Sequence, residues 1–106
     1  MASRPGSHLE TGITEVAETG KPVKLTSTVP SGISLGILVQ CDPSNTGSQC
    51  VIGDKNVVAK KTLGETRGIV LETKQIPVRI EISDPTQLYV DAAASKDRVI
   101  WTAIVG

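Results

Sequence analysis

Aromatic residues are nearly absent from this chain of 106 residues, which has one Trp, one Tyr and no Phe. Because aromatic side chains bury the largest areas in most protein cores, this core has to be built mainly from Val, Ile, Leu and Ala. An aliphatic core of this size gives modest stability, so we expect association with further copies or with a partner to add to it.

Histidine is equally scarce, and His8 is the only one. A Ser-His-Asp or Cys-His catalytic arrangement needs a histidine that the fold holds in place, which the polar stretch around His8 does not predict. A structural zinc site, with its four N or S ligands, is disfavoured for the same reason. The chain also has no glycine-rich phosphate loop followed by a helix. We therefore expect neither enzymatic activity nor a cofactor.

The chain also has no excess of charge of either sign, because 11 Lys and Arg balance 11 Asp and Glu and the net charge is 0. Long-range attraction to nucleic acid or to an anionic membrane has no support from this balance. The sequence shows no apolar run of transmembrane length, no apolar signal segment after Met1, and Ala2 where myristoylation needs glycine. We expect a globular protein with neither nucleic acid nor membrane as a partner.

The chain does contain a series of short segments with strand character. Pro, Gly, Asp and Asn separate these segments at short intervals, a spacing typical of a β-sandwich or β-barrel. The expected strands are 13–17, 23–28, 33–41, 49–52, 57–59, 69–71, 78–82, 88–91 and 99–105. Residues 1–19 are predicted to form a flexible N-terminal arm and residues 20–106 a single all-β, antiparallel sandwich domain.

The clearest strand signal lies in the last third of the chain. Residues 78–82, 88–92 and 99–105 alternate or are rich in β-branched residues, with turn residues between them. This pattern predicts an antiparallel meander, in which a hairpin loop at 95–97 joins the last two strands.

The last expected strand has two apolar faces. One face consists of Val99, Trp101, Ala103 and Val105, and the other of Ile100, Thr102 and Ile104. The alternation places Trp101 in the core rather than at the surface, where its ring could stack on a sugar. The second face is explained either by a strand buried on both sides or by a subunit contact. For the subunit contact, the candidate self-association residues are Ile100 and Ile104.

Two cysteines, Cys41 and Cys50, flank a loop rich in turn-forming residues. If segments 33–41 and 49–52 form a hairpin, the two sulfur atoms face each other and a disulfide is one alternative. The other alternative, buried or free thiols in a reducing compartment, is favoured by the lack of a signal segment.

Four aspartates, Asp42, Asp84, Asp91 and Asp97, lie in or beside expected turns. Aspartate often caps backbone amides at such positions. We favour this role over a carboxylate pair for acid–base catalysis and over a loop calcium site, and we expect no metal.

The segment Tyr89-Val90-Asp91-Ala92, followed by a short loop and Val99-Ile100-Trp101, resembles the C-terminal ending of small tailed-phage virion proteins of the capsid decoration or cement type. Segments 37–41, 45–47, 51–53, 68–72 and 78–80 follow the order of the same plan. The resemblance covers residues 25–105, whereas residues 1–24 match nothing in it. It implies a jelly-roll-like β-sandwich on the outside of a phage head or at its neck.

The function that this resemblance implies is capsid decoration. Such a protein is made in the host cytoplasm, lies on the outer head surface of the virion, binds the major capsid protein and forms a dimer or trimer. Under this hypothesis the N-terminal arm grips the capsid through the candidate residues Arg4, Leu9, Ile13 and Val16. Two alternatives stay open: a head- or tail-fibre adhesion module that binds host glycans, and a neck or tail-completion protein.

Overall fold

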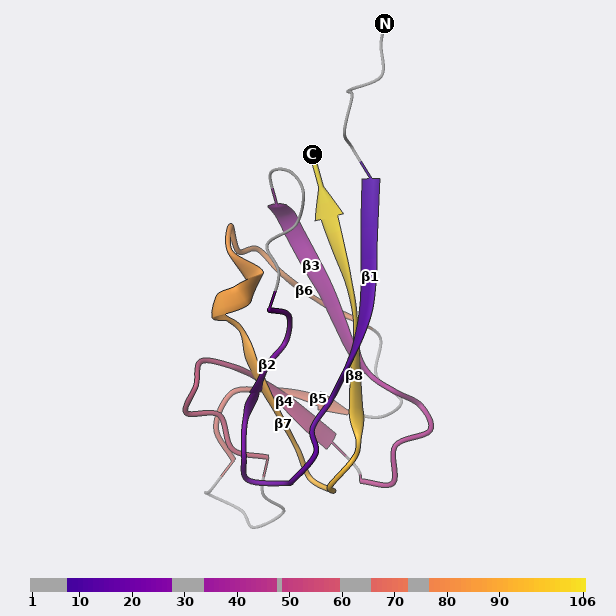
Figure 1. The fold of residues 1–106 in the computed structure, drawn as a ribbon, viewed down its shortest axis with the longest axis vertical. Helices are drawn as coiled ribbons and strands as arrows, with labels where there is room; N and C mark the ends of the chain where they lie inside the picture. The colour runs from indigo at the N-terminus through magenta and orange to yellow at the C-terminus, as the bar shows by residue number, and fades with distance from the viewer. Residues whose placement is uncertain (1–7, 28–33, 48, 60–65, 73–76) are drawn as a thin grey trace, which may run out of the picture.

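The computed structural model describes residues 8–27, 34–47, 49–59, 66–72 and 77–106. Within these residues the chain forms two four-stranded antiparallel sheets that pack together as a sandwich (Figure 1). This arrangement confirms the predicted all-β class.

Consecutive strands lie in different sheets, except for the fourth and fifth strands, which pair with each other in one sheet. Sheet A has the strand order β1 (His8–Glu15), β8 (Arg98–Val105), β3 (Ser34–Cys41) and β6 (Val78–Ile80). Sheet B has the strand order β2 (Val23–Lys24), β7 (Tyr89–Ala92), β4 (Gln49–Gly53) and β5 (Ile69–Glu72). A short 3-10 helix, η1 (Pro85–Gln87), precedes β7.

The strand pairs are nested within one another. β1 pairs with β8, β2 with β7, β3 with β6 and β4 with β5, all antiparallel. Further antiparallel pairs, β3 with β8 and β4 with β7, join these four into two sheets. A long hairpin rolled up in this way is a jelly roll, the fold that the family resemblance implied.

Most expected strands have a counterpart in the structure, although the expected strand 23–28 is formed only over Val23–Lys24. The expected connections between the last strands are wrong. β6 and β8 belong to sheet A, whereas β7 belongs to sheet B. Residues 78–105 therefore form neither a meander nor a terminal hairpin. The loop between β3 and β4 also crosses between the sheets, so these strands form no hairpin either. Residues 57–59, expected as a strand, contribute only a bridge between Val58 and Arg67.

The predicted flexible arm over residues 1–19 is wrong from His8 onward. His8–Glu15 is the eight-residue strand β1, which pairs with β8 along its whole length (Figure 1). Beyond it, Val16 is completely buried and the Thr19 hydroxyl donates to the carbonyl of Ala92 at 2.5 Å. The segment is polar because β1 lies at a sheet edge, where many of its side chains are in water. The sandwich therefore begins before residue 20, and residues 1–7 lie outside the described part.

The core between the sheets is aliphatic, as the composition predicted. Sheet A contributes Ile37 and Val39, and sheet B contributes Ile52, Leu71 and Val90, all at 1% exposure or less. Because these inner faces are filled, any surface for binding a partner has to lie on the outside of the sandwich.

Candidate interaction surface

The outer face of sheet A carries an exposed apolar surface. Leu9 and Ile13 on β1 are 64% and 60% exposed. Leu9 lies opposite Ile104 of β8, and Ile13 lies opposite Ile100. Leu38 extends the surface onto β3, the next strand of the sheet. We call these five residues, Leu9, Ile13, Leu38, Ile100 and Ile104, the apolar face.

Strand alternation explains why these side chains point outward. Ile37 and Val39 on either side of Leu38 are fully buried in the core, so Leu38 has to face the opposite way. Val99 and Ala103 are likewise fully buried. Their neighbours on β8 therefore belong to the outer face.

The outer face of sheet B, in contrast, is covered at its centre by the chain itself. Val51 of β4 packs there with Val57 and Ala59 from the segment that follows β4, and Tyr89 packs against the same cluster. The fold thus covers Val51 on the outer face of sheet B, where Val70 stays 36% exposed, and leaves Leu9 and Ile13 on the outer face of sheet A in contact with solvent.

Asp91 of β7 fastens this cover. Its carboxylate is fully buried and accepts hydrogen bonds from the backbone N–H groups of Gly20 at 3.0 Å, Ala59 at 2.9 Å and Ala92 at 2.9 Å. Gly20 lies between β1 and β2, and Ala59 lies between β4 and β5, so one side chain holds two connections. The predicted amide-capping role is confirmed, although Asp91 lies in a strand rather than a turn.

Asp97 has a similar role at the end of the sandwich. It is 4% exposed, and its carboxylate accepts from the backbone N–H groups of Thr46 at 2.9 Å and Gly47 at 2.7 Å. These bonds join the loop before β8 to the loop between β3 and β4.

Asp42 and Asp84 cap their own turns, as predicted. Two hydrogen bonds from Ser44, the stronger from its backbone N–H and the weaker from its hydroxyl, lower the pKa of the Asp42 carboxylate. The hydroxyl and then the backbone N–H of Thr86 lower the pKa of Asp84 at the start of η1. Among the described residues, no three or more His, Cys, Asp and Glu side chains are grouped so that they could hold a metal ion.

The structure brings most of the predicted contact residues together. Four of them lie on the apolar face: Leu9, Ile13, Ile100 and Ile104. Val16 does not, because its side chain points to the opposite side of the chain and is completely buried in the core. Its prediction as a capsid contact is therefore wrong, and Arg4 lies outside the described residues.

Leu38 is the member of the apolar face that the sequence analysis did not identify. The signal was available in the apolar run Ile37-Leu38-Val39, because alternation has to turn the middle residue away from its two neighbours. Alternation alone does not show which of the two sheets has its outer face covered by other segments of the chain.

Charged side chains border the apolar face. Glu15 and Arg98 lie opposite each other at one end of the β1–β8 pair, and Arg98 Nε is 3.2 Å from the Asp42 carboxylate. On β6 the guanidinium of Arg79 donates to the carbonyl of Leu35 at 2.9 Å. An apolar centre with a polar rim is the usual composition of a protein–protein interface.

Trp101 belongs to the inner face of sheet A, as predicted, where it packs against the core cluster. Its indole N–H donates to the Thr14 hydroxyl at 3.2 Å. The ring lies so close to Gly12 that a Cβ atom there would be 2.3 Å from Trp101 Cζ2. The ring is therefore occupied by the fold and offers no platform for stacking a sugar.

Cys41 and Cys50 are buried free thiols in opposite sheets. The Cys41 thiol donates to the carbonyl oxygen of Leu71 at 2.8 Å, and Leu71 is the partner of Cys50 in the β4–β5 pair. A hydrogen bond from Cys50 lowers the pKa of the Cys41 thiol, and the same bond together with burial raises the pKa of Cys50. The structure thus holds the free thiols and not the disulfide.

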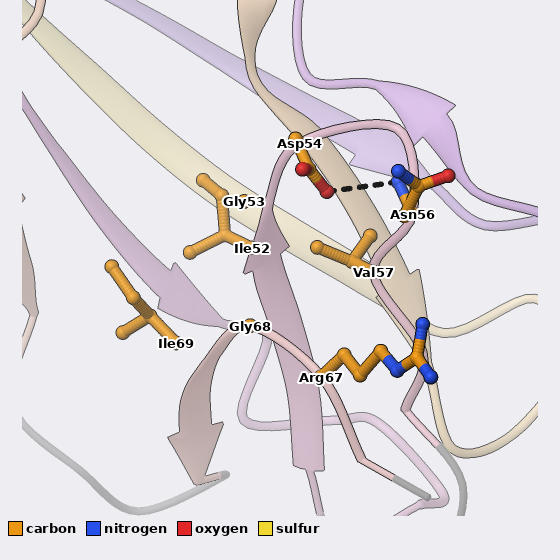
Figure 2. Close-up of a pocket in the computed structure, with 8 residues that line it drawn as sticks. All are labelled: Ile52, Gly53, Asp54, Asn56, Val57, Arg67, Gly68 and Ile69. Atoms are coloured by element: carbon orange, nitrogen blue, oxygen red, sulfur yellow. Dashed lines mark hydrogen bonds between the residues drawn. The ribbon is translucent and has the colours of Figure 1, made fainter.

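A pocket of about 480 Å³ opens where β4 ends (Figure 2). Its lining residues are Ile52, Gly53, Asp54, Asn56, Val57, Arg67, Gly68 and Ile69. The Asp54 carboxylate is used by its own turn, because it accepts from the backbone N–H of Asn56 at 2.9 Å. A Cβ atom on Gly53 or Gly68 would come within 2.8 or 2.9 Å of Val57 Cγ1. The shape of the pocket therefore follows from the packing of Val57, and we assign no ligand to it.

Comparison with protein-family models, with curated proteins and with solved structures gives no match. No helix in the described residues is long and apolar enough to cross a membrane.

Proposed function

We propose that this chain is a virion structural protein that decorates the assembled head of a tailed phage and stabilises it. The observation that carries the proposal is the apolar face of a four-stranded sheet, in which Leu9 and Ile13 are exposed and Leu38, Ile100 and Ile104 are half-buried. The jelly roll supports it, because this fold is common among viral capsid domains. The C-terminal sequence resemblance to decoration proteins supports it as well.

The size of the apolar face suits a repeated, reversible contact. β1, β8 and β3 each have eight residues. At about 3.3 Å per residue and about 4.8 Å between strands, these three strands have a flat footprint of roughly 400 Å², which includes Thr11 and Thr102 as well as the apolar face. A stable interface takes about 800 Å² from each partner. One such face gives a weak contact by itself, and many copies on one shell add up to a substantial stabilisation.

The mechanism is mass action. A protein that binds the assembled shell, but not free or unfolded coat protein, shifts the equilibrium toward the shell by its binding free energy. This role needs a rigid surface and no reaction chemistry. The partner is the major capsid protein, and binding at points where capsomers meet bridges neighbouring subunits.

The test is binding to purified heads that were assembled without this chain. We expect the wild-type protein to bind them and Ile100→Asp to bind at least about tenfold more weakly, because the charge lies in the middle of the apolar face. Val70→Asp is the matched control, since Val70 is a 36% exposed apolar residue on β5 of the other sheet. If wild type does not bind, or if both variants weaken binding equally, the proposal is wrong.

Copy number distinguishes this proposal from its alternatives. A decoration protein is present in many copies on each head, whereas a neck or tail-completion protein forms one ring at a single vertex. Quantitative mass spectrometry of purified particles measures this ratio. The glycan-binding alternative has less support, because the only Trp is packed against Gly12 inside the sandwich.

A further inference from the structure

β1 is an unusually open sheet edge. Of the four edge strands, β2, β5 and β6 have two, four and three residues. β1 has eight, and its register with β8 runs without a shift. Proteins protect long edges from pairing with other chains by charged side chains, above all Lys, and by Pro, bulges or a covering segment. The acidic residues of β1 are Glu10 and Glu15. His8–Glu15 contains no Pro, no Lys and no bulge, and no described strand pairs with its outer edge.

The backbone of β1 presents a defined set of free groups at this edge. The N–H of Val16 donates to the carbonyl of Asp97 at 2.9 Å, which places the even-numbered residues of the strand in hydrogen bonds with β8. The odd-numbered residues Leu9, Thr11 and Ile13 therefore direct their N–H and C=O groups away from β8. Their side chains lie on the outer face of sheet A, so both kinds of group are available to the same partner.

We propose that β1 pairs antiparallel with β1 of a second copy around a two-fold axis at Thr11. In this register Leu9 lies opposite Ile13 of the second copy, Ile13 lies opposite its Leu9, and the two Thr11 residues face each other. Leu9 and Ile13 each gain an apolar neighbour from the second copy, and the two-fold axis makes this pair occur twice in the dimer. No two residues of like charge lie opposite each other in this register. The two neighbouring registers lose the apolar pairs. A shift of two residues in one direction places Glu15 opposite Leu9, and a shift of two residues in the other direction places Thr11 opposite Leu9.

The pairing also continues the rows of side chains across the whole dimer. Leu9 lies opposite Ile104 and Ile13 opposite Ile100 within one chain. The joined sheets therefore carry two rows of four aliphatic side chains, each made of Ile104, Leu9, Ile13 and Ile100. A row of four threonines runs between them, because Thr11 lies opposite Thr102. The result is one continuous sheet of eight strands.

The dimer can be tested on the isolated protein, without the proposed role on a phage head. We expect wild type to sediment as a dimer of the 11.1-kDa chain as its concentration is raised from micromolar to millimolar. Leu9→Lys or Ile13→Glu alone weakens dimerisation at least about tenfold, because each change places two charges against apolar side chains at the seam. Both side chains are mostly exposed in the monomer, so the fold is retained.

Combining the two substitutions tests the register. In the double variant each introduced lysine faces an introduced glutamate of the second copy, so the dimer returns. An equimolar mixture of the two single variants gives a heterodimer for the same reason. Ile104→Lys is the control, since Ile104 lies one strand away from the seam, and it changes the dimerisation constant by less than about threefold.

Amide hydrogen exchange reports on the backbone directly. The amides of Leu9, Thr11 and Ile13 are slow in the dimer and fast in monomeric Leu9→Lys, whereas those of Gly12 and Thr14, bonded to β8, stay slow in both. A wild-type protein that is monomeric throughout overturns the proposal. So does a dimer that Ile104→Lys dissociates and Leu9→Lys does not, because the copies then pack face to face. Neither outcome decides whether the protein binds phage heads.

Discussion

At the scale of single residues, the buried carboxylate of Asp91 holds two connections of the chain through the backbone N–H groups of Gly20 and Ala59. Asp91→Asn keeps the shape of the side chain but replaces one carboxylate oxygen with an NH₂ group, which is a donor. In either orientation of the amide, this NH₂ group faces a backbone N–H that donates to the carboxylate in the wild-type protein. We expect the free energy of unfolding to fall by about 2–3 kcal/mol, the cost of leaving such a buried group unsatisfied. Urea unfolding measures this change.

Asp54→Asn is the matched control for this substitution. Asp54 is exposed and accepts one backbone N–H within its own turn, and the asparagine oxygen can replace that acceptor. Its effect should stay below about 0.5 kcal/mol. Equal unfolding midpoints for both variants would show that Asp91 does not hold the loops.

Gly12 is a second residue whose identity the structure explains. A Cβ atom there would be 2.3 Å from Trp101 Cζ2, so Gly12→Ala has to displace the indole ring and its bond to Thr14. We expect a loss of about 1–3 kcal/mol in the free energy of unfolding. In a Trp101→Leu background the same change should cost less than about 0.5 kcal/mol, because the ring is gone. Additive effects in this double-mutant cycle would contradict the contact.

At the scale of elements, the segment before residue 20 behaves as part of the sandwich. Val16 is completely buried and Ile13, three residues earlier, is 60% exposed on the outer face. Val16→Ala should lower the free energy of unfolding by about 2 kcal/mol through lost burial and a cavity. Ile13→Ala in dilute solution should change it by less than about 0.5 kcal/mol. A flexible arm predicts no effect from either change, so thermal and urea unfolding of the pair separate the two descriptions.

The same elements show how far the sequence determines this fold. Local alternation identified most strands and placed Trp101 in the core and Ile100 on the opposite face, because the direction of a side chain depends on its immediate neighbours in the chain. It could not predict that the strands before and after the turn at 95–97 belong to different sheets, since pairing depends on segments distant in sequence. Only residues 13–15 of the polar edge strand β1 fell within an expected strand, for a related reason: half of its side chains face water, so the composition of residues 8–12 resembled a loop.

The site was predictable to a similar extent. Ile100 and Ile104 were identified from the unusual second face of their strand, without knowledge of the sheet. The inclusion of Leu38, and the exclusion of Val16, required the structure, because only the register with β8 and the packing of the core show which side of each strand is covered.

At the scale of the whole molecule, the proposed binding mode and the net charge of 0 make one joint prediction. If the apolar face binds the shell, most of the free energy comes from apolar burial and little from long-range attraction. Raising the salt concentration from about 0.05 M to about 0.5 M should then change the affinity for heads by less than about threefold. Titration calorimetry should also give a negative heat-capacity change on binding.

Binding through charges predicts the opposite salt response. A protein that neutralised six to ten phosphates would lose about a thousandfold or more in affinity over a much smaller increase in salt. A steep loss for this chain would therefore move the contact from the apolar face to its charged rim, where Arg98 and Arg79 lie. Arg98 is already bonded to Asp42 at 3.2 Å, so Arg79→Ala is the sharper variant in that case. If the apolar face is the contact, Arg79→Ala leaves the affinity for heads nearly unchanged while Ile100→Asp removes it.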